Sequence, residues 1–292
     1  MARYVTAGVD ESDESLAAAH WAAREALRRG AWLRLVHAGA WQGAPAPSAA
    51  ETLGWAVRSV RAAHPGLEVA DLLESDSPVT ALLAREPDSE VLVLGSRGLG
   101  RVAGFVLGSV SQRVIARSTR PVVLVRAGDA CADEHLPALD GVSPDEIPET
   151  PYREVVLGLG ARHPAPDLVE FAFEAARRRD TALRVVHALP GAAHGADGRV
   201  GPEDAEESPI AREHLVAGWL RPWYDAYPSV AVTLTVTADH PAAELVRAAS
   251  HASLVVVGRG GPQPQTRPGP RIGSVAHAVL HHVCCPVAVV PV

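Results

Sequence analysis

The sequence predicts an α/β protein with two tandem doubly wound domains, each a five-stranded parallel sheet of order 3-2-1-4-5 flanked by helices. Two observations support this prediction. Short apolar runs alternate with segments of helical periodicity, and runs from the first half of the chain recur in the second half. The 292 residues are enough for two domains with cores of their own.

The first half supplies strands and helices in alternation. Strands are expected where apolar and β-branched residues cluster, and helices where apolar-face positions recur every three or four residues, as at Leu16, His20 and Ala23. The expected strands are Tyr4–Val9, Trp32–Ala38, Leu67–Leu73, Val91–Gly95 and Pro121–Arg126. The expected helices are Ser12–Arg29, Thr52–Ala63, Pro78–Arg85 and Ser109–Arg117.

The second half repeats this order. Leu33–Ala38 recurs as Leu183–Ala188, 150 residues later, and Val91–Gly95 recurs as Leu254–Gly258, 163 residues later. An offset of this size indicates duplication of a whole domain rather than a short-period solenoid. We therefore expect the second half, from residue 153 to 292, to repeat the fold of residues 1–126.

The net charge of −7 arises in one segment. Residues 127–152 contain seven Asp or Glu and no Arg, while the other 27 acidic residues and the 27 Arg cancel. An acidic linker is therefore expected between two nearly neutral domains, neither of which has the basic surface of a nucleic-acid-binding protein. No apolar run is long enough to span a membrane, the start does not resemble a signal peptide, and three cysteines make no disulfide framework. These features predict a cytoplasmic protein.

A glycine pattern follows the fourth expected strand. It reads Gly95-x2-Gly98-x9-Gly108-Ser109 and leads into a helix. Glycines in such a loop can adopt positive φ and turn N–H groups inward, and the helix start adds unpaired N–H groups with a partial positive charge. Ser109 can cap the helix or donate its hydroxyl to an anion. The pattern predicts a phosphate-binding site.

A second polar residue should face the same crevice. In a 3-2-1-4-5 sheet, ligands bind between the carboxyl ends of strands 1 and 4. Asp10 ends strand 1 and Gly95 ends strand 4. Asp10 either contacts the ligand or caps the following helix, a role that its neighbours Ser12 and Asp13 could also fill. Arg97 and Arg101 either reach the phosphate or stay solvated.

The second half lacks these features. Gly160 stands where Asp10 would be, and the loop reads Gly258-Arg259-Gly260-Gly261, then eleven residues to Gly273-Ser274. Four of the eleven are prolines, which supply no N–H donor. One phosphate site per chain is expected, in the first domain. The chain also has no lysine, which excludes a Walker-A loop and Schiff-base chemistry.

Two other clusters have structural interpretations. His281-His282-Val283-Cys284-Cys285 resembles a metal site, but adjacent residues rarely turn together toward one tetrahedral ion, so a helix end running into a buried strand is expected. Trp219, Trp223 and Tyr227 lie four residues apart on an expected helix that Pro222 interrupts. They are interpreted as packing aromatics.

These residues resemble the universal stress protein family in its tandem two-domain form. The glycine pattern matches the Gly-x2-Gly-x9-Gly-[Ser/Thr] of its ATP-binding members, and Val9-Asp10-Glu11-Ser12 matches their first strand end. The resemblance implies ATP, with Mg²⁺ or Mn²⁺ held through the phosphates, and backbone contacts from Ala38 to adenine. The residues expected to bind the nucleotide are Asp10, Ala38, Gly95, Arg97, Gly98, Gly108, Ser109, Val110 and Ser111.

The same resemblance and the apolar last strands of the two halves lead to expectations about assembly and activity. Pro121–Arg126 and Pro286–Val290 are apolar edge strands that need cover, and single-domain family members pair through this strand. An intrachain pseudo-dimer is expected, with a further homodimer through another face. No triad or general base marks an enzyme, so regulation through conformation or partners is the expected function. A slow ATPase or nucleotidyl-transferring enzyme, and a scaffold without nucleotide, are the alternatives.

Overall fold

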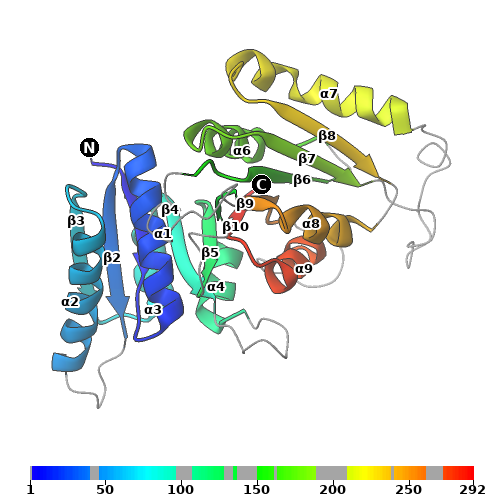
Figure 1. Ribbon diagram of the computed structural model, residues 1–292. Coiled ribbons are helices and arrows are strands. Elements are labelled where there is room, and N and C mark those ends of the chain that lie inside the picture. Colours follow the sequence, from blue (N-terminus) through cyan, green and yellow to red (C-terminus); the bar gives the residue numbers. More distant parts are fainter. Residues whose placement is uncertain are drawn as a thin grey trace. The chain divides into compact units, whose positions relative to one another are not determined.

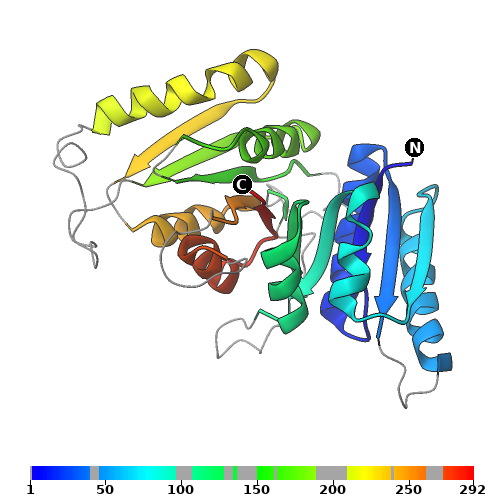
Figure 2. The same cartoon turned by 180° about the vertical axis from the view of Figure 1, so that it is seen from behind.

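The computed structural model divides into two compact units (Figures 1 and 2). Unit 1 comprises Met1–Ala130 and Arg259–Pro291, and unit 2 comprises Cys131–Gly258 with Val292. The last helix and strand of the chain thus belong to the same unit as the first half of the sequence. The structure describes residues 2–39, 46–96, 107–127, 134–136, 150–160, 163–188, 209–237, 240–260 and 272–292.

The sheet of unit 1 has the predicted order. Its strands are β1 (Tyr4–Gly8), β2 (Trp32–Ala38), β3 (Val69–Glu74), β4 (Ser89–Ser96), β5 (Val122–Arg126) and β10 (Val287–Val290). They lie in the order β3-β2-β1-β4-β5-β10, and the neighbours from β3 to β5 are parallel. The chain reverses its direction of winding between β1 and β4, which confirms a doubly wound sheet.

Helices cover both faces of this sheet. They are α1 (Asp13–Arg29), α2 (Ala46–Ala63), α3 (Pro78–Leu83), α4 (Ser109–Arg117) and α9 (Ser274–His282), with a 3₁₀ turn η1 (Glu86–Asp88). Figures 1 and 2 show α1 and α2 on one face, with α3 and α4 on the other.

Two helix boundaries in the first repeat differ from the prediction by two residues or more. The helix α2 begins at Ala46 rather than Thr52. The stretch before Thr52, which contains Ala and Pro, has no apolar periodicity from which a helix could be predicted. The helix α3 ends at Leu83 rather than Arg85. Pro87 cannot donate the bond that would continue the helix from Leu83, so the chain tightens into η1.

The last strands of the two repeats pair, as predicted. Strand β10 runs antiparallel to β5, with Val287 opposite Leu124, Ala288 opposite Val123 and Val289 opposite Val122. Every residue of both strands is buried. An apolar edge of β5 is therefore covered by a strand from the far end of the same chain.

Unit 2 repeats the parallel arrangement. Its strands β6 (Glu154–Leu159), β7 (Leu183–Ala188), β8 (Val232–Thr237) and β9 (Ala252–Gly258) lie in the order β9-β6-β7-β8. Its helices are α6 (Pro166–Arg178), α7 (Pro209–Ala226) and α8 (Pro241–Ala249). Strands β9, β6, β7 and β8 of the second repeat correspond in order to β4, β1, β2 and β3 of the first.

The aromatic residues of α7 pack against α6, as their spacing predicted. The indole N–H of Trp223 donates to Glu170 at 3.0 Å, and the Tyr227 hydroxyl donates to the same carboxylate. The Phe173 ring lies 5.5 Å from that of Tyr227. The expectation that Pro222 would interrupt the helix is wrong, because α7 continues through it.

In unit 1, the end of β4 touches the backbone of α1. A Cβ atom built on Gly95 would lie 2.6 Å from the carbonyl carbon and oxygen of Glu14 and 2.8 Å from the Ser15 nitrogen. No side chain fits at such distances, and the obstructing atoms are backbone that cannot move aside cheaply. Gly95 is therefore required by the packing of β4 on α1.

We expect Gly95→Ala to lower the free energy of unfolding by about 1–3 kcal/mol, the usual cost of an overpacked site. Gly39→Ala is the matched control, because a Cβ there meets nothing within 4 Å. Urea denaturation of both variants checks the prediction. Equal urea midpoints for the two variants would show that the backbone of α1 can shift to make room for a side chain at residue 95.

Two histidines meet between α1 and α2. The Nδ1 atom of His20 lies 3.5 Å from Nε2 of His64, and Nε2 of His20 bonds the Ser59 hydroxyl at 3.0 Å. Burial, followed by the charges of His20 and Arg24, lowers the pKa of His64 to about 4. Burial and Arg24 also lower the pKa of His20. The folded protein therefore resists protonation of this pair.

The free energy of unfolding should fall as the pH falls from about 6.5 toward 4, because the unfolded chain takes up protons that the folded pair resists. In His64→Gln this dependence should be weaker, while the exposed His282→Gln should retain it. Urea titrations at several pH values measure the slopes. If wild type and His64→Gln have the same slope, the pair does not titrate as described.

Candidate functional site

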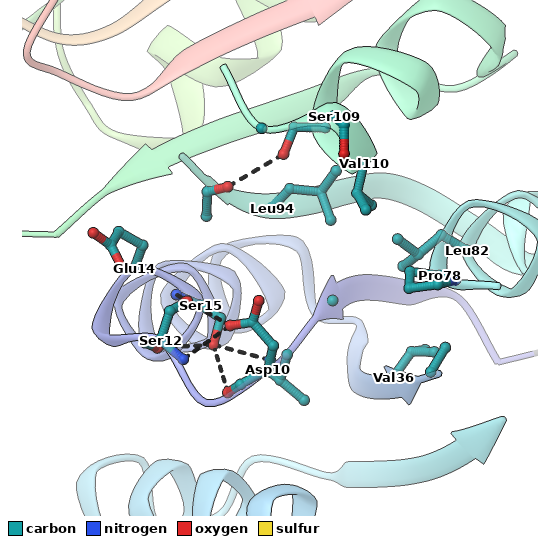
Figure 3. Close-up of a pocket in the computed structure, with 16 residues that line it drawn as sticks. Asp10, Ser12, Glu14, Ser15, Val36, Pro78, Leu82, Leu94, Ser109 and Val110 are labelled. Carbon is teal, nitrogen blue, oxygen red and sulfur yellow. Dashed lines mark hydrogen bonds between the residues drawn. The ribbon is translucent and has the colours of Figure 1, made fainter. Parts of the chain in front are cut away.

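A cavity of about 200 Å³ lies at the carboxyl ends of β1 and β4. The first turns of α1, α3 and α4 complete its walls. Figure 3 shows Asp10, Ser12 and Ser15 on one side, Ser109 and Val110 on the opposite side, and Pro78 and Leu82 along another. This is the position where the reversal of strand order creates a crevice.

The structure brings most of the predicted site residues together around this cavity. Arg97 and Gly98 lie outside the described residues, as does Arg101. The predicted residues that line the cavity are Asp10, Ala38, Gly95, Gly108, Ser109, Val110 and Ser111.

Several lining residues were not predicted. Pro78 and Leu82 come from α3, and Val36 and Leu94 come from β2 and β4. Because α3 follows β3 directly, its first turn must lie at the same sheet edge, and that topology was the available signal. The side chains themselves are ordinary core types, so no motif distinguished them.

Asp10 does not cap α1. The cap is Ser12, whose hydroxyl accepts from the Ser15 N–H at 3.2 Å. Asp10 accepts instead from the Ser12 N–H at 2.9 Å and from the Ser12 hydroxyl, and its own N–H donates to the Ser15 hydroxyl at 3.0 Å. These bonds fix the turn between β1 and α1, with Asp10 lining the cavity.

The first turn of α4 has a different electrostatic character from that of α1. The first turn of α1 is capped by Ser12 and carries Asp13 and Glu14, so its partial positive charge is already balanced. The N-cap of α4 is Gly108, which offers no side chain, and the first turn of α4 has no acidic residue. The opening N–H groups of α4 are therefore the better site for an anion.

The glycine pattern was expected to contain glycines with positive φ, and this expectation is wrong for Gly95 and Gly108, the two glycines of the pattern that the structure describes. Gly108 has φ −60° and ψ 147°, the extended conformation of an N-cap. Among the described glycines, positive φ occurs at Gly30, Gly66 and Gly260. Gly95 is needed for close approach, as described above, and Gly108 leaves the helix start without a competing cap.

Two polar side chains near the cavity have structural partners. The Ser111 hydroxyl donates to the Gly95 carbonyl oxygen at 3.3 Å and so ties α4 to β4. The Nδ1 atom of His37 lies 2.9 Å from the Val9 carbonyl oxygen, which joins the ends of β1 and β2. His37 therefore has a structural role and is not among the residues that line the cavity, whereas its neighbour Ala38 is.

The helix start in the second repeat is closed by its own loop. The N–H of Gly273, the N-cap of α9, donates to the Arg259 carbonyl oxygen at 2.7 Å. A Cβ built on Gly260 would lie 3.2 Å from the Gly273 Cα, so the two segments are in contact. The N-cap N–H of α9 is thus bonded to protein backbone, and its helix start is in contact with the segment before it.

The second repeat also differs where Asp10 would be. Gly160 occupies that position, and a Cβ there would meet nothing within 4 Å. His187, the counterpart of His37, is fully buried, and its ring lies 6.1 Å from that of Trp219, edge to face. Burial and the charge of Arg212 lower the pKa of His187, so this imidazole favours its neutral form.

Comparison with known proteins agrees with the geometry. The universal stress protein family profile matches residues 1–126 and 151–291. A universal stress protein of Mycobacterium tuberculosis is 32% identical over 313 residues, covering 98% of this chain and 96% of that protein. One of Mycolicibacterium smegmatis is 31% identical over 304 residues, with coverages of 98% and 96%.

A solved structure supports the fold alone. A universal stress protein from Archaeoglobus fulgidus superposes with a TM-score of 0.66 at 16% identity, covering 99% of this chain and 98% of that one. No helix in the described part of the chain is long and apolar enough to cross a membrane. With two matched segments and relatives of the same length, the chain belongs to the universal stress protein family as a tandem two-domain member.

Proposed function

We propose that this protein binds ATP in the cavity of unit 1 and acts in the cytoplasm as a stress-response regulator. One observation carries the proposal: the uncapped start of α4 and the Asp10 turn face each other across one cavity at the strand reversal. The opening N–H groups of α4 suit phosphate oxygens, and Ser109 adds a hydroxyl donor. Arg97 and Gly98 belong to the proposed site through the sequence pattern.

The rest of the cavity suits a nucleoside. Val36, Leu82 and Leu94 supply apolar surface for a flat base, and the backbone at Ala38 supplies polar groups for its edge. In the described residues no group of three His, Cys, Asp or Glu could hold a metal ion. Mg²⁺ or Mn²⁺ would therefore be bound mainly through the phosphates, as is usual for Mg²⁺ in nucleotide sites.

Regulation fits the site better than turnover does. The polar groups of the cavity are hydroxyls, backbone N–H groups, and the carboxylates of Asp10 and Glu14. Asp10 is committed to the bonds that hold the Ser12 turn. A slow ATPase or nucleotidyl transferase is the second candidate, and ADP, or AMP with pyrophosphate, appearing on incubation with ATP would favour it.

The assembly that we propose is a homodimer.

Titration calorimetry with MgATP should give one site per chain, because one helix start is open and its counterpart at Gly273 is closed by the Arg259 carbonyl. The same titration without the metal should show weaker binding. Two equivalent sites, or no heat of binding, would contradict this assignment.

Asp10→Ala should weaken ATP binding by roughly 1–3 kcal/mol, about ten- to a hundredfold, the scale of a lost hydrogen bond involving a charged group. Gly160→Ala is the matched control at the equivalent position, where there is space for a Cβ. Calorimetry measures affinity, and circular dichroism confirms that both variants are folded. An unchanged dissociation constant for Asp10→Ala would limit this residue to its bonds with Ser12.

A further inference from the structure

Arg259 follows β9, at the position where the glycine pattern of the first repeat has its counterpart, and its backbone is bonded on both sides. The Arg259 N–H donates to the Val290 carbonyl oxygen at 2.8 Å, which ties it to β10. Its own carbonyl accepts from the Gly273 N–H at 2.7 Å, which ties it to the start of α9. The backbone of this residue is thus anchored on both sides.

The side chain of Arg259 reaches the end of α4. Its Nη1 atom donates to the Ser118 carbonyl oxygen at 2.6 Å and lies 3.4 Å from the Ile115 carbonyl oxygen. Ser118 is the C-cap of α4, so these are carbonyls of the helix's last turn. Carbonyls at a helix end lack intrahelical partners, and a cation there also complements the helix dipole. Arg259 therefore caps α4 from the second repeat.

A reciprocal contact exists at α9. Arg126, the last residue of β5, donates from Nη2 to the Leu280 carbonyl oxygen at 2.8 Å, near the end of α9. Burial lowers the pKa of Arg126 to about 10, which leaves it charged at neutral pH. Each repeat thus caps the last helix of the other, but of these two helices only α4 lines the cavity.

The helix α4 is short enough to depend on its ends. It has nine residues, and an isolated helix of that length is not stable in water. At its start, the Ser111 hydroxyl bonds Gly95, and Ser109 to Ser111 line the cavity. At its end, Arg259 bonds the last carbonyls. Donors that are already fixed bind an anion without a further ordering cost.

We propose that Arg259 is a positioning residue of the nucleotide site in unit 1, acting through α4. The second repeat, whose own helix start is closed, thereby supplies a group on which the affinity of the first repeat depends. This inference rests on the proposed ATP site.

The test compares Arg259→Ala with Arg126→Ala in the full chain. Each variant removes one arginine that caps a helix, so both should lower the melting temperature. Only Arg259→Ala should weaken MgATP binding, by about tenfold, within the range found for residues outside a binding site. Arg259→Lys, which keeps a donor but loses the planar fork, should recover part of the affinity.

Hydrogen exchange gives a second readout without nucleotide. The amides of Val114 to Arg117 should exchange faster in Arg259→Ala than in Arg126→Ala. Equal ATP affinities in these two variants would overturn the inference. If wild type binds no ATP, the proposed function fails by itself, and equal exchange rates in α4 would then overturn the positioning role separately.

Discussion

The contact between the end of β4 and the first turn of α1 is the constraint on which the rest of unit 1 depends. With no side chain at Gly95, strand and helix backbones approach to a distance that no other residue permits. This contact sets the Asp10 turn and the start of α4 on opposite sides of one cavity, since Asp10 precedes α1 and the Ser111 hydroxyl bonds the Gly95 carbonyl. Gly95, which the sequence pattern assigned to a phosphate-binding loop, is thus needed for packing.

The sequence was sufficient to predict the fold and many of the residues that line the cavity, for a physical reason. Buried parallel strands and short amphipathic helices leave strong periodic patterns, and the duplication repeats each pattern, so the order of β3, β2, β1, β4 and β5 could be predicted. Long-range contacts leave no such pattern. Pro78 could have been placed at the cavity only from the sheet topology, because it belongs to no motif. The Arg259 contact with Ser118 could not be predicted, because it depends on which elements meet in space.

The two repeats share one architecture but differ where the strand order reverses. Core packing depends on many apolar residues, so it tolerates the change from Asp10 to Gly160. The polar groups at a helix start are few, and at α9 the Gly273 N–H is bonded to a backbone carbonyl. Arg259, which supplies that carbonyl, bonds the end of α4 with its side chain.

The membership of β10 in unit 1 has a consequence for synthesis of the chain. Strand β5 ends at Arg126, but its partner ends at Val290, so the pairing needs nearly the whole chain. At about 5–20 residues per second, the ribosome leaves this edge of β5 unpaired for roughly ten to thirty seconds. During that time the nascent first repeat exposes an apolar strand edge, which is prone to pairing with other chains. On a polysome several such edges lie close together, which favours their pairing with one another.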